Sequence, residues 1–155
     1  MRKKLLFVIS LSVLMLSTGL VMESRALPSS YQETPSLYKR LGGYDALAAV
    51  TDDFIVRLAT DKSLGRFFTG ASKDSQKKIR THVVDLLCQA TGGPCIYIGR
   101  SMKDSHAGLG ITEADWTAAA KHLGDTLDKF KVPAAEKAEV FKIVGTLKAD
   151  IVEKP

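Results

Sequence analysis

Helical periodicity is the feature that most constrains how this chain folds. From Tyr44 onward, apolar residues recur every three or four positions, as in helices that bury one face. No alternating pattern of useful length predicts a strand. The class is therefore all-α, with four main helices. The four apolar faces are Leu47, Val50, Phe54, Ile55 and Leu58; Ile79, Val83, Leu86, Leu87 and Ala90; Trp116, Ala119, Ala120, Leu123, Leu127 and Phe130; and Val140, Phe141, Val144, Leu147 and Ile151.

Turn-forming and capping residues divide these helices. A short helical turn over residues 36–41 ends at a pair of glycines, and Ser72 precedes the second long helix. Residues 92–105 form a Gly-rich irregular crossing between the second and third long helices. Thr112 with Asp115 makes a variant capping box for the third. Val132 and Pro133 end it, and Pro133 suits the first turn of the last helix.

The N-terminus has the layout of a secretory signal peptide. A basic start is followed by an almost wholly apolar or small run over residues 5–22, and Ser24 and Ala26 supply small residues at the cleavage site. We expect residues 1–26 to be removed, residues 27–35 to form a linker, and residues 36–155 to form one exported, periplasmic domain. Because the apolar run is long, an uncleaved membrane anchor is the competing interpretation.

The basic charge of the chain belongs largely to this leader. Removing residues 1–26 takes away four basic residues and one acid, which lowers the formal net charge from +5 to +2. No clustered basic face remains, and Lys77, Lys78 and Arg80 are interpreted as a solvated helix face. Nucleic acid is therefore not an expected partner.

Both cysteines, Cys88 and Cys95, lie in the expected exported part. An oxidising compartment permits a disulfide, and the intervening Gly92-Gly93-Pro94 can turn the chain back. Two free or buried thiols remain an equal alternative, because sequence does not show geometry. A two-cysteine metal site is disfavoured by the spacing.

The chain contains three histidines, of which His106 has the most unusual setting. It sits on a short segment before Gly108 and Gly110, which allow close backbone turns. An imidazole presented in this way can reach a metal, and haem iron takes a proximal histidine. A haem also needs apolar surroundings, although the same residues would equally make an ordinary core. The candidates are Phe54, Ile55, Phe67, Phe68, Ile79, Val83, Leu86 and Met102.

Several segments of the chain form an ordered set. They are Leu37-Tyr38-Lys39-Arg40-Leu41-Gly42-Gly43, Asp53-Phe54, Phe67-Phe68, Ala90-Thr91-Gly92-Gly93-Pro94, Tyr97-Ile98-Gly99-Arg100 and Met102 through Ile111. In this order and spacing the set resembles the group I truncated haemoglobins, the small two-over-two globins, over about residues 37–148. The resemblance implies a two-over-two helical sandwich around haem.

The resemblance also implies roles for individual residues. His106 would be the proximal ligand of iron, and Phe68 would stack on the haem. Phe54, Ile79, Val83 and Met102 would line the haem pocket. Because no C-x-x-C-H motif is present, the cofactor is expected to be haem b, held without a c-type attachment. Residues implied near the propionates are Lys78, Tyr97, Arg100 and Lys103.

The departures from the family pattern concern the distal side. Where the family commonly has Tyr, this chain has Ile55, and positions that commonly hold Gln are Ile79 and Val83. Bound oxygen carries partial negative charge, which hydrogen-bond donors stabilise. We therefore expect bound oxygen to receive less hydrogen-bond stabilisation than in the family, and we expect a smaller effect on the binding of CO and NO.

His82 corresponds to a position where some relatives supply a second iron ligand. With His106 on the other side, the haem would be six-coordinate before any gas binds. The alternative is that His82 points to solvent or to a propionate. His122 is interpreted as structural.

The predicted function is reversible binding of diatomic gases by an exported haem protein, in oxygen or NO handling. NO dioxygenation would need an external reductase, so catalytic activity stays open. A different class is a bis-histidine electron-transfer or redox-sensing protein with its own redox partner, because two constant ligands suit electron transfer. A haem-free helical protein on the same scaffold is the third alternative.

Overall fold

The structure is a computed structural model that describes residues 34–154. The predicted signal peptide and most of the predicted linker lie outside these residues. The described part is helical, and its one β-bridge pairs Thr112 with Lys154. Its elements are α1 (Leu37–Arg40), α2 (Gly43–Thr60), the 3₁₀ turn η1 (Gly65–Phe67), α3 (Lys73–Ala90), α4 (Met102–His106), α5 (Glu113–Lys129), α6 (Ala134–Gly145) and α7 (Lys148–Ile151).

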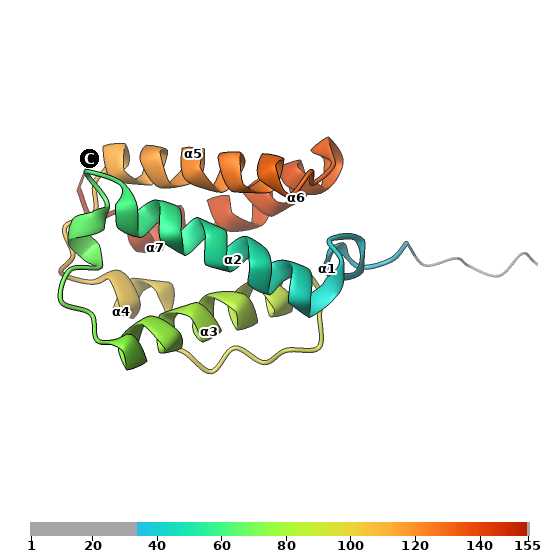
Figure 1. The fold of residues 1–155 in the computed structure, drawn as a ribbon, viewed down its shortest axis with the longest axis horizontal. Helices are drawn as coiled ribbons and strands as arrows, with labels where there is room; N and C mark the ends of the chain where they lie inside the picture. The colour runs from blue at the N-terminus through green and yellow to red at the C-terminus, as the bar shows by residue number, and fades with distance from the viewer. Residues whose placement is uncertain (1–33, 155) are drawn as a thin grey trace, which may run out of the picture. The chain divides into compact units, whose positions relative to one another are not determined.

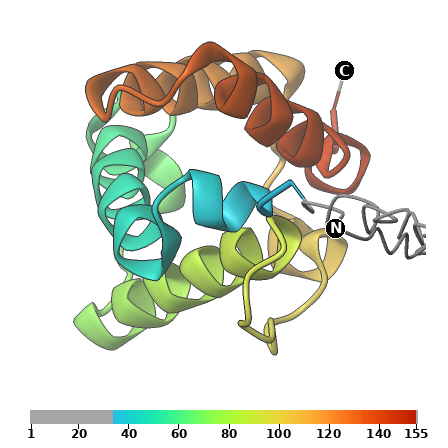
Figure 2. The ribbon, with the colours of Figure 1, turned by 90° about the vertical axis from the view of Figure 1, so that its right-hand side faces the viewer.

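Helix α2 is the central element of the arrangement. It packs against α3 on one side and against α5 on the other, and α6 runs beside α5 in both ribbon views (Figures 1 and 2). The pairs α2/α3 and α5/α6 therefore form two layers. The short helix α4 packs against α7, at the end of the molecule where α5 begins (Figure 1).

The main hydrophobic core lies between α1, α2, α5 and α6. Burial of each large aliphatic side chain contributes about 2 kcal/mol of favourable transfer free energy. The sequence expectation for α2, α5 and α6 is confirmed, because their residues in the core cluster fall on the predicted faces. The cluster consists of Leu37, Val50, Leu123, Leu127 and Val140.

The buried face of α3 differs from the predicted one. Val84 and Cys88 are fully buried, whereas Val83 is half-buried and Ile79 is 39% exposed. Residues 84 and 88 are one helical turn apart and face the molecule's interior together. The buried face of α3 is therefore offset from the predicted one. The side chains of Ile79 and Val83 keep apolar surface that the core does not cover.

Three other expectations are corrected. Residues 102–105 belong to a helix and not to the irregular crossing, because Ser101 caps α4 by accepting a hydrogen bond from the backbone N–H of Asp104. The last helix is broken into α6 and α7 at residues 146–147, and Pro133 lies at the N-cap of α6, one position before the expected place.

Charged residues hold the helices together. The carboxylate of Asp53 on α2 accepts hydrogen bonds from Arg57, from Lys129 and from the hydroxyl of Thr126 on α5. Arg40, the last residue of α1, pairs with Glu136 and Glu139 on α6. Apart from the Arg57–Asp53 pair, which lies within α2, these contacts join segments that are distant in sequence.

The start of α5 is capped as predicted. Thr112 and Asp115 form a capping box, and the buried Asp115 carboxylate also accepts a hydrogen bond from Arg66 in η1, at 2.7 Å. Among residues 34–154, no helix has both the length and the apolar character needed to cross a membrane.

Candidate functional site

His106 is the last residue of α4, and its ring is fixed by one hydrogen bond. Nδ1 lies 2.7 Å from the backbone carbonyl oxygen of Met102, one turn earlier. A carbonyl oxygen only accepts hydrogen bonds, so Nδ1 carries the proton. The neutral imidazole then keeps the lone pair of Nε2, which is the form of histidine that binds a metal.

The segment after His106 turns sharply. Gly108 and Gly110 have φ angles of +79° and +65°, in the left-handed region that favours glycine. Their backbone N–H groups donate to the carboxylate of Glu153, which follows α7. These two hydrogen bonds, with that from Gly108 the larger cause, hold the pKa of Glu153 below its ordinary value. Sequence periodicity could not have found Glu153, because a backbone-to-carboxylate contact leaves no pattern.

His82, on α3, lies against Tyr97 of the crossing. The two ring centroids are 5.9 Å apart and the ring planes are inclined by 77°. The Nδ1 atom of His82 is buried and has no hydrogen-bond partner among the described residues. A buried imidazole nitrogen without a partner is a cost that a ligand or metal can relieve.

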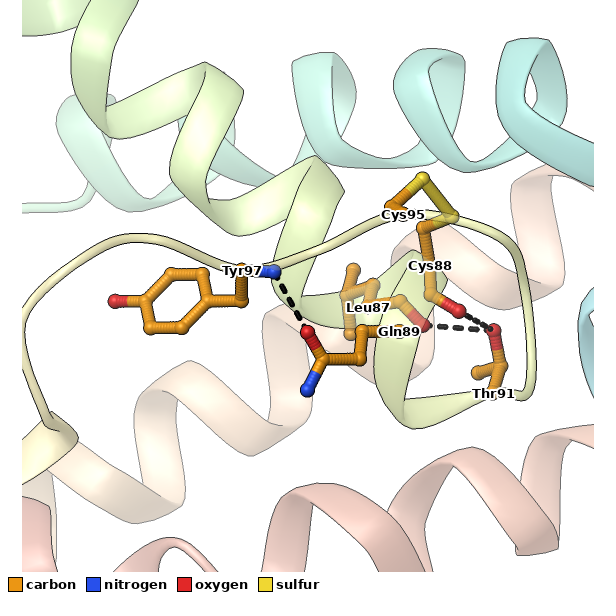
Figure 3. Close-up of a disulfide and its surroundings, with 6 residues drawn as sticks. All are labelled: Leu87, Cys88, Gln89, Thr91, Cys95 and Tyr97. Atoms are coloured by element: carbon orange, nitrogen blue, oxygen red, sulfur yellow. Dashed lines mark hydrogen bonds between the residues drawn. A yellow bond between two sulfur atoms is a disulfide. The ribbon is translucent and has the colours of Figure 1, made fainter.

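The crossing that carries Tyr97 is joined to α3 by a disulfide. Cys88 and Cys95 are bonded, with their Cα atoms 5.7 Å apart (Figure 3), so the disulfide alternative of the sequence interpretation holds. Gly93 lies in the enclosed turn, where a Cβ atom would stand 2.7 Å from the sulfur of Cys88. Only glycine fits that close approach without a shift.

Two further hydrogen bonds fix Tyr97. Its backbone N–H donates to the side-chain oxygen of Gln89 at 2.6 Å (Figure 3), and its hydroxyl donates to the carbonyl oxygen of Arg100 at 2.6 Å. The disulfide and these bonds hold the crossing along α3. They place the Tyr97 ring where it meets His82.

The predicted apolar pocket residues come from four parts of the chain. Most are half-buried, which leaves apolar surface available on the elements that surround the site. Phe54 also packs against the main core cluster, so part of its surface serves the core. The basic residues expected near the propionates, Lys78, Arg100 and Lys103, are exposed. The half-buried apolar residues are Phe54 and Ile55 on α2, Phe67 and Phe68 at η1, Val83 and Leu86 on α3 and Met102 on α4.

His122 has a structural contact, as the sequence interpretation expected. Its Nε2 atom donates to the carboxylate of Asp61 at 2.9 Å, which ties α5 to the segment after α2. Ser63 and then His122 lower the pKa of Asp61 through their hydrogen bonds. The Nε2 atom of His122 is therefore engaged, whereas its buried Nδ1 atom, like that of His82, has no hydrogen-bond partner among the described residues. An unpartnered Nδ1 alone therefore does not distinguish His82 from a structural histidine.

Comparison with known proteins identifies the family. The sequence profile of the bacterial-like globins matches residues 36–153. The group 1 truncated hemoglobin GlbN of Mycolicibacterium paratuberculosis is 35% identical over 119 residues, covering 77% of this chain and 85% of the relative. The chain belongs to the bacterial-like globins, as a group 1 truncated haemoglobin.

Other relatives of this globin agree in sequence and in fold. GlbN of a Nostoc species is 35% identical over 119 residues, covering 77% of this chain and 98% of the relative. The Fe(III) form of truncated hemoglobin from Tetrahymena pyriformis superposes with a TM-score of 0.70 at 27% identity, covering 77% of this globin and 100% of that chain.

A second solved structure extends the likeness. The 2/2 hemoglobin from a Synechococcus species, solved in the cyanomet state with covalently attached heme, has a TM-score of 0.69 at 30% identity. The match covers 76% of this globin and 98% of that chain. The predicted two-over-two fold is confirmed, and the comparisons, all with haemoglobins, do not favour the electron-transfer alternative.

Proposed function

We propose that this globin holds haem b with Nε2 of His106 as the axial ligand of iron, and that it binds diatomic gases reversibly. Family membership supports the cofactor, and one observation carries the choice of ligand. The hydrogen bond from Nδ1 of His106 to Met102 fixes the tautomer and leaves Nε2 free. Such a second hydrogen bond orients a ligating histidine and raises its basicity.

The surrounding residues would hold the group by apolar burial and by charge. The half-buried side chains of Phe54, Phe68, Val83 and Met102, together with Ile79, supply the apolar contact. Lys78, Arg100 and Lys103 supply cations for the carboxylates at the haem edge. The haem iron, when bound, supplies the position at which a gas binds.

The distal lining sets the order of gas affinities. Ile55, Ile79 and Val83 have no donor to offer a bound gas. A hydrogen-bond donor stabilises a polar bound ligand most. The absence of a donor therefore lowers the affinity for oxygen more than the affinity for CO. This globin therefore binds CO and NO in preference to oxygen by a wider margin than relatives that retain the distal donors.

His82 is the residue that we assign to the sixth position of the iron in the absence of gas. Its buried Nδ1 atom lacks a partner among the described residues, and its contact with Tyr97 restricts the ring. A gas would then have to displace the His82 side chain. The ferrous protein should show a low-spin, six-coordinate spectrum that His82→Ala converts to a high-spin, five-coordinate one. A high-spin spectrum that is the same with and without His82 would remove this assignment.

The decisive experiment removes the axial imidazole and then restores it. His106→Gly should bind haem poorly and lose the ferrous–CO spectrum of the parent. Free imidazole in millimolar amounts should restore that spectrum, because it refills the space left by the side chain. His122→Gln is the matched control, since it keeps a polar group beside Asp61 and should leave the spectrum unchanged. Equal haem spectra for His106→Gly and the parent would contradict the proposal.

We also propose that the protein acts outside the cytoplasm, in the periplasm or an equivalent exported location. The disulfide between Cys88 and Cys95 supports this, because such bonds persist in oxidising compartments. Cell fractionation with mass spectrometry of the N-terminus tests it. A mature chain that begins at Leu27 is expected, whereas a cytoplasmic chain that retains residues 1–26 would contradict it.

A further inference from the structure

The segment that follows His106 is held by the C-terminal end of the described chain. Oε1 of Glu153 accepts a hydrogen bond from the backbone N–H of Gly108, and Oε2 accepts one from Gly110, both at 2.5 Å. Both oxygens of the Glu153 carboxylate thus accept hydrogen bonds from the turn that begins two residues after His106, the proposed ligand. Charged acceptors make stronger hydrogen bonds than neutral ones.

The backbone of the same end adds to this contact. The N–H groups of Glu153 and Lys154 both donate to the carbonyl oxygen of Ile111, at 2.9 and 3.2 Å. Thr112 pairs with Lys154 in the single parallel bridge of residues 34–154. Residues 153–154 therefore contact the turn along its length, from Gly108 to Thr112. We call these two residues the C-terminal clamp.

The clamped turn is attached directly to the proposed ligand. The N–H of Leu109 donates to the carbonyl oxygen of His106, and α4 itself has five residues. A helix this short is not stable alone and takes its position from its surroundings. Helix α7, which leads into the clamp, is the helix that packs against α4.

We propose that Glu153 is a positioning residue for the iron ligand, which fixes the His106 imidazole by holding the turn that follows it. The proposal rests on the proposed role of His106. It assigns to Glu153 an effect on the iron–histidine bond that a merely stabilising surface contact would not have. Some residues contact a metal ligand and orient it without binding the metal themselves. Removing such a residue commonly changes metal affinity by about 10–100-fold.

The test compares two neighbouring acids in the full haem-loaded protein. Glu153→Gln keeps the size of the side chain but leaves only one oxygen to accept from two N–H groups. Asp150→Asn is the matched control, because Asp150 is an exposed acid on α7, three residues away, that loses the same charge. In a His82→Ala background, which gives five-coordinate ferrous haem, resonance Raman spectroscopy reads the iron–histidine stretching band.

We expect Glu153→Gln to shift and broaden that band and to speed haem transfer to an acceptor apoglobin by about tenfold. Asp150→Asn should match the parent in both. If Glu153→Gln lowers only the melting temperature and leaves the band and the transfer rate unchanged, the positioning role is wrong.

A second measurement tests the clamp without a variant. In the CO-bound protein, the backbone N–H groups of Gly108 and Gly110 should exchange with solvent deuterium far more slowly than exposed loop amides. Fast exchange of both would overturn the proposal. Failure of the proposed function has a different signature, because a His106→Gly protein with the parent's spectrum would leave Glu153 without a ligand to position.

Discussion

The ring of Tyr97 stands edge-on to the ring of His82, with the centroids 5.9 Å apart. Tyr97 is itself held by Gln89, by Arg100 and by the disulfide that closes the turn before it. The orientation of His82 therefore depends on a crossing segment and not only on α3.

Replacing Tyr97 by Leu should weaken the proposed ligation of iron by His82. An edge-on aromatic contact contributes about 0.5–1.5 kcal/mol, so CO binding that waits for His82 to leave should become about two- to tenfold faster. Flash photolysis or stopped-flow mixing with CO measures the rate. Tyr97→Phe keeps the ring and loses only the hydroxyl bond to Arg100, so it should remain close to the parent. Equal rates in the two variants would contradict the role of the ring.

Loss of the disulfide should destabilise the fold. Cys88 and Cys95 close a short loop, and chain entropy predicts that replacing both by Ser lowers the free energy of unfolding by about 2.5 kcal/mol. Urea unfolding followed by circular dichroism measures it. A reductant should shift the parent in the same direction and leave the double variant unchanged. A parent insensitive to complete reduction would show that the bond does not stabilise the protein.

Protonation of Asp53 should lower the free energy of unfolding in acid. Hydrogen bonds from Arg57 and then Lys129 lower its pKa from 3.8 to about 2. Because the folded pKa lies below the unfolded one, the stabilisation is present above about pH 4 and is lost as the pH falls toward 2. Unfolding free energies measured across this window should decline more steeply for the parent than for Asp53→Asn. Parallel curves would indicate that Asp53 does not titrate with folding.

Asp53→Ala adds a test at neutral pH. It leaves the fully buried hydroxyl of Thr126 without its acceptor, which should cost about 1–3 kcal/mol. Asp128→Ala, at an exposed carboxylate paired only with Lys137, is the control and should cost less than about 1 kcal/mol.

Asp115 should matter more than its salt-bridge partner. Asp115→Ala removes the ion pair with Arg66 and the half of the capping box in which the carboxylate accepts from the N–H and the hydroxyl of Thr112, for a loss of about 1–3 kcal/mol from the polar groups left unpaired. The Thr112 hydroxyl still accepts from the backbone N–H of residue 115. Arg66→Ala keeps the cap, and Arg66 is half-exposed, so its loss should stay below about 1 kcal/mol. Thermal unfolding compares them. An Arg66→Ala loss equal to that of Asp115→Ala would shift the stabilisation from the cap to the ion pair.

Local signals in the sequence predicted most of the helices. Ser72 and the Thr112–Asp115 pair mark helix starts with their own side chains, and the apolar spacing of α2 and α5 matches the buried cluster. The break between α6 and α7 follows Gly145, and a single glycine inside a continuing apolar pattern does not by itself predict where a helix ends. The buried face of α3 is offset from the predicted one because Val83 and Val84 are adjacent, and apolar spacing does not choose between them.

The candidate site, like the fold, could be predicted from the sequence only in part. His106 was recognisable from its motif, but its tautomer depends on a backbone carbonyl that only the helix α4 brings within reach. The contact between Tyr97 and His82 and the contact between Glu153 and Gly108 join residues far apart in the chain. Such contacts depend on tertiary packing, and a single sequence does not encode them in any period or motif.

The ion pairs of Arg40 have a consequence for the order in which the chain is completed. Arg40 bonds to Glu136 and Glu139 on α6, and the N–H of Tyr38 donates to the carbonyl oxygen of Thr91. A ribosome makes the N-terminal residues first, so Arg40 waits for nearly a hundred further residues before Glu136 and Glu139 exist. The ion pairs that fasten α1 to α6 are therefore among the last contacts of the fold to become possible, after the contacts of α1 with α2 and with Thr91.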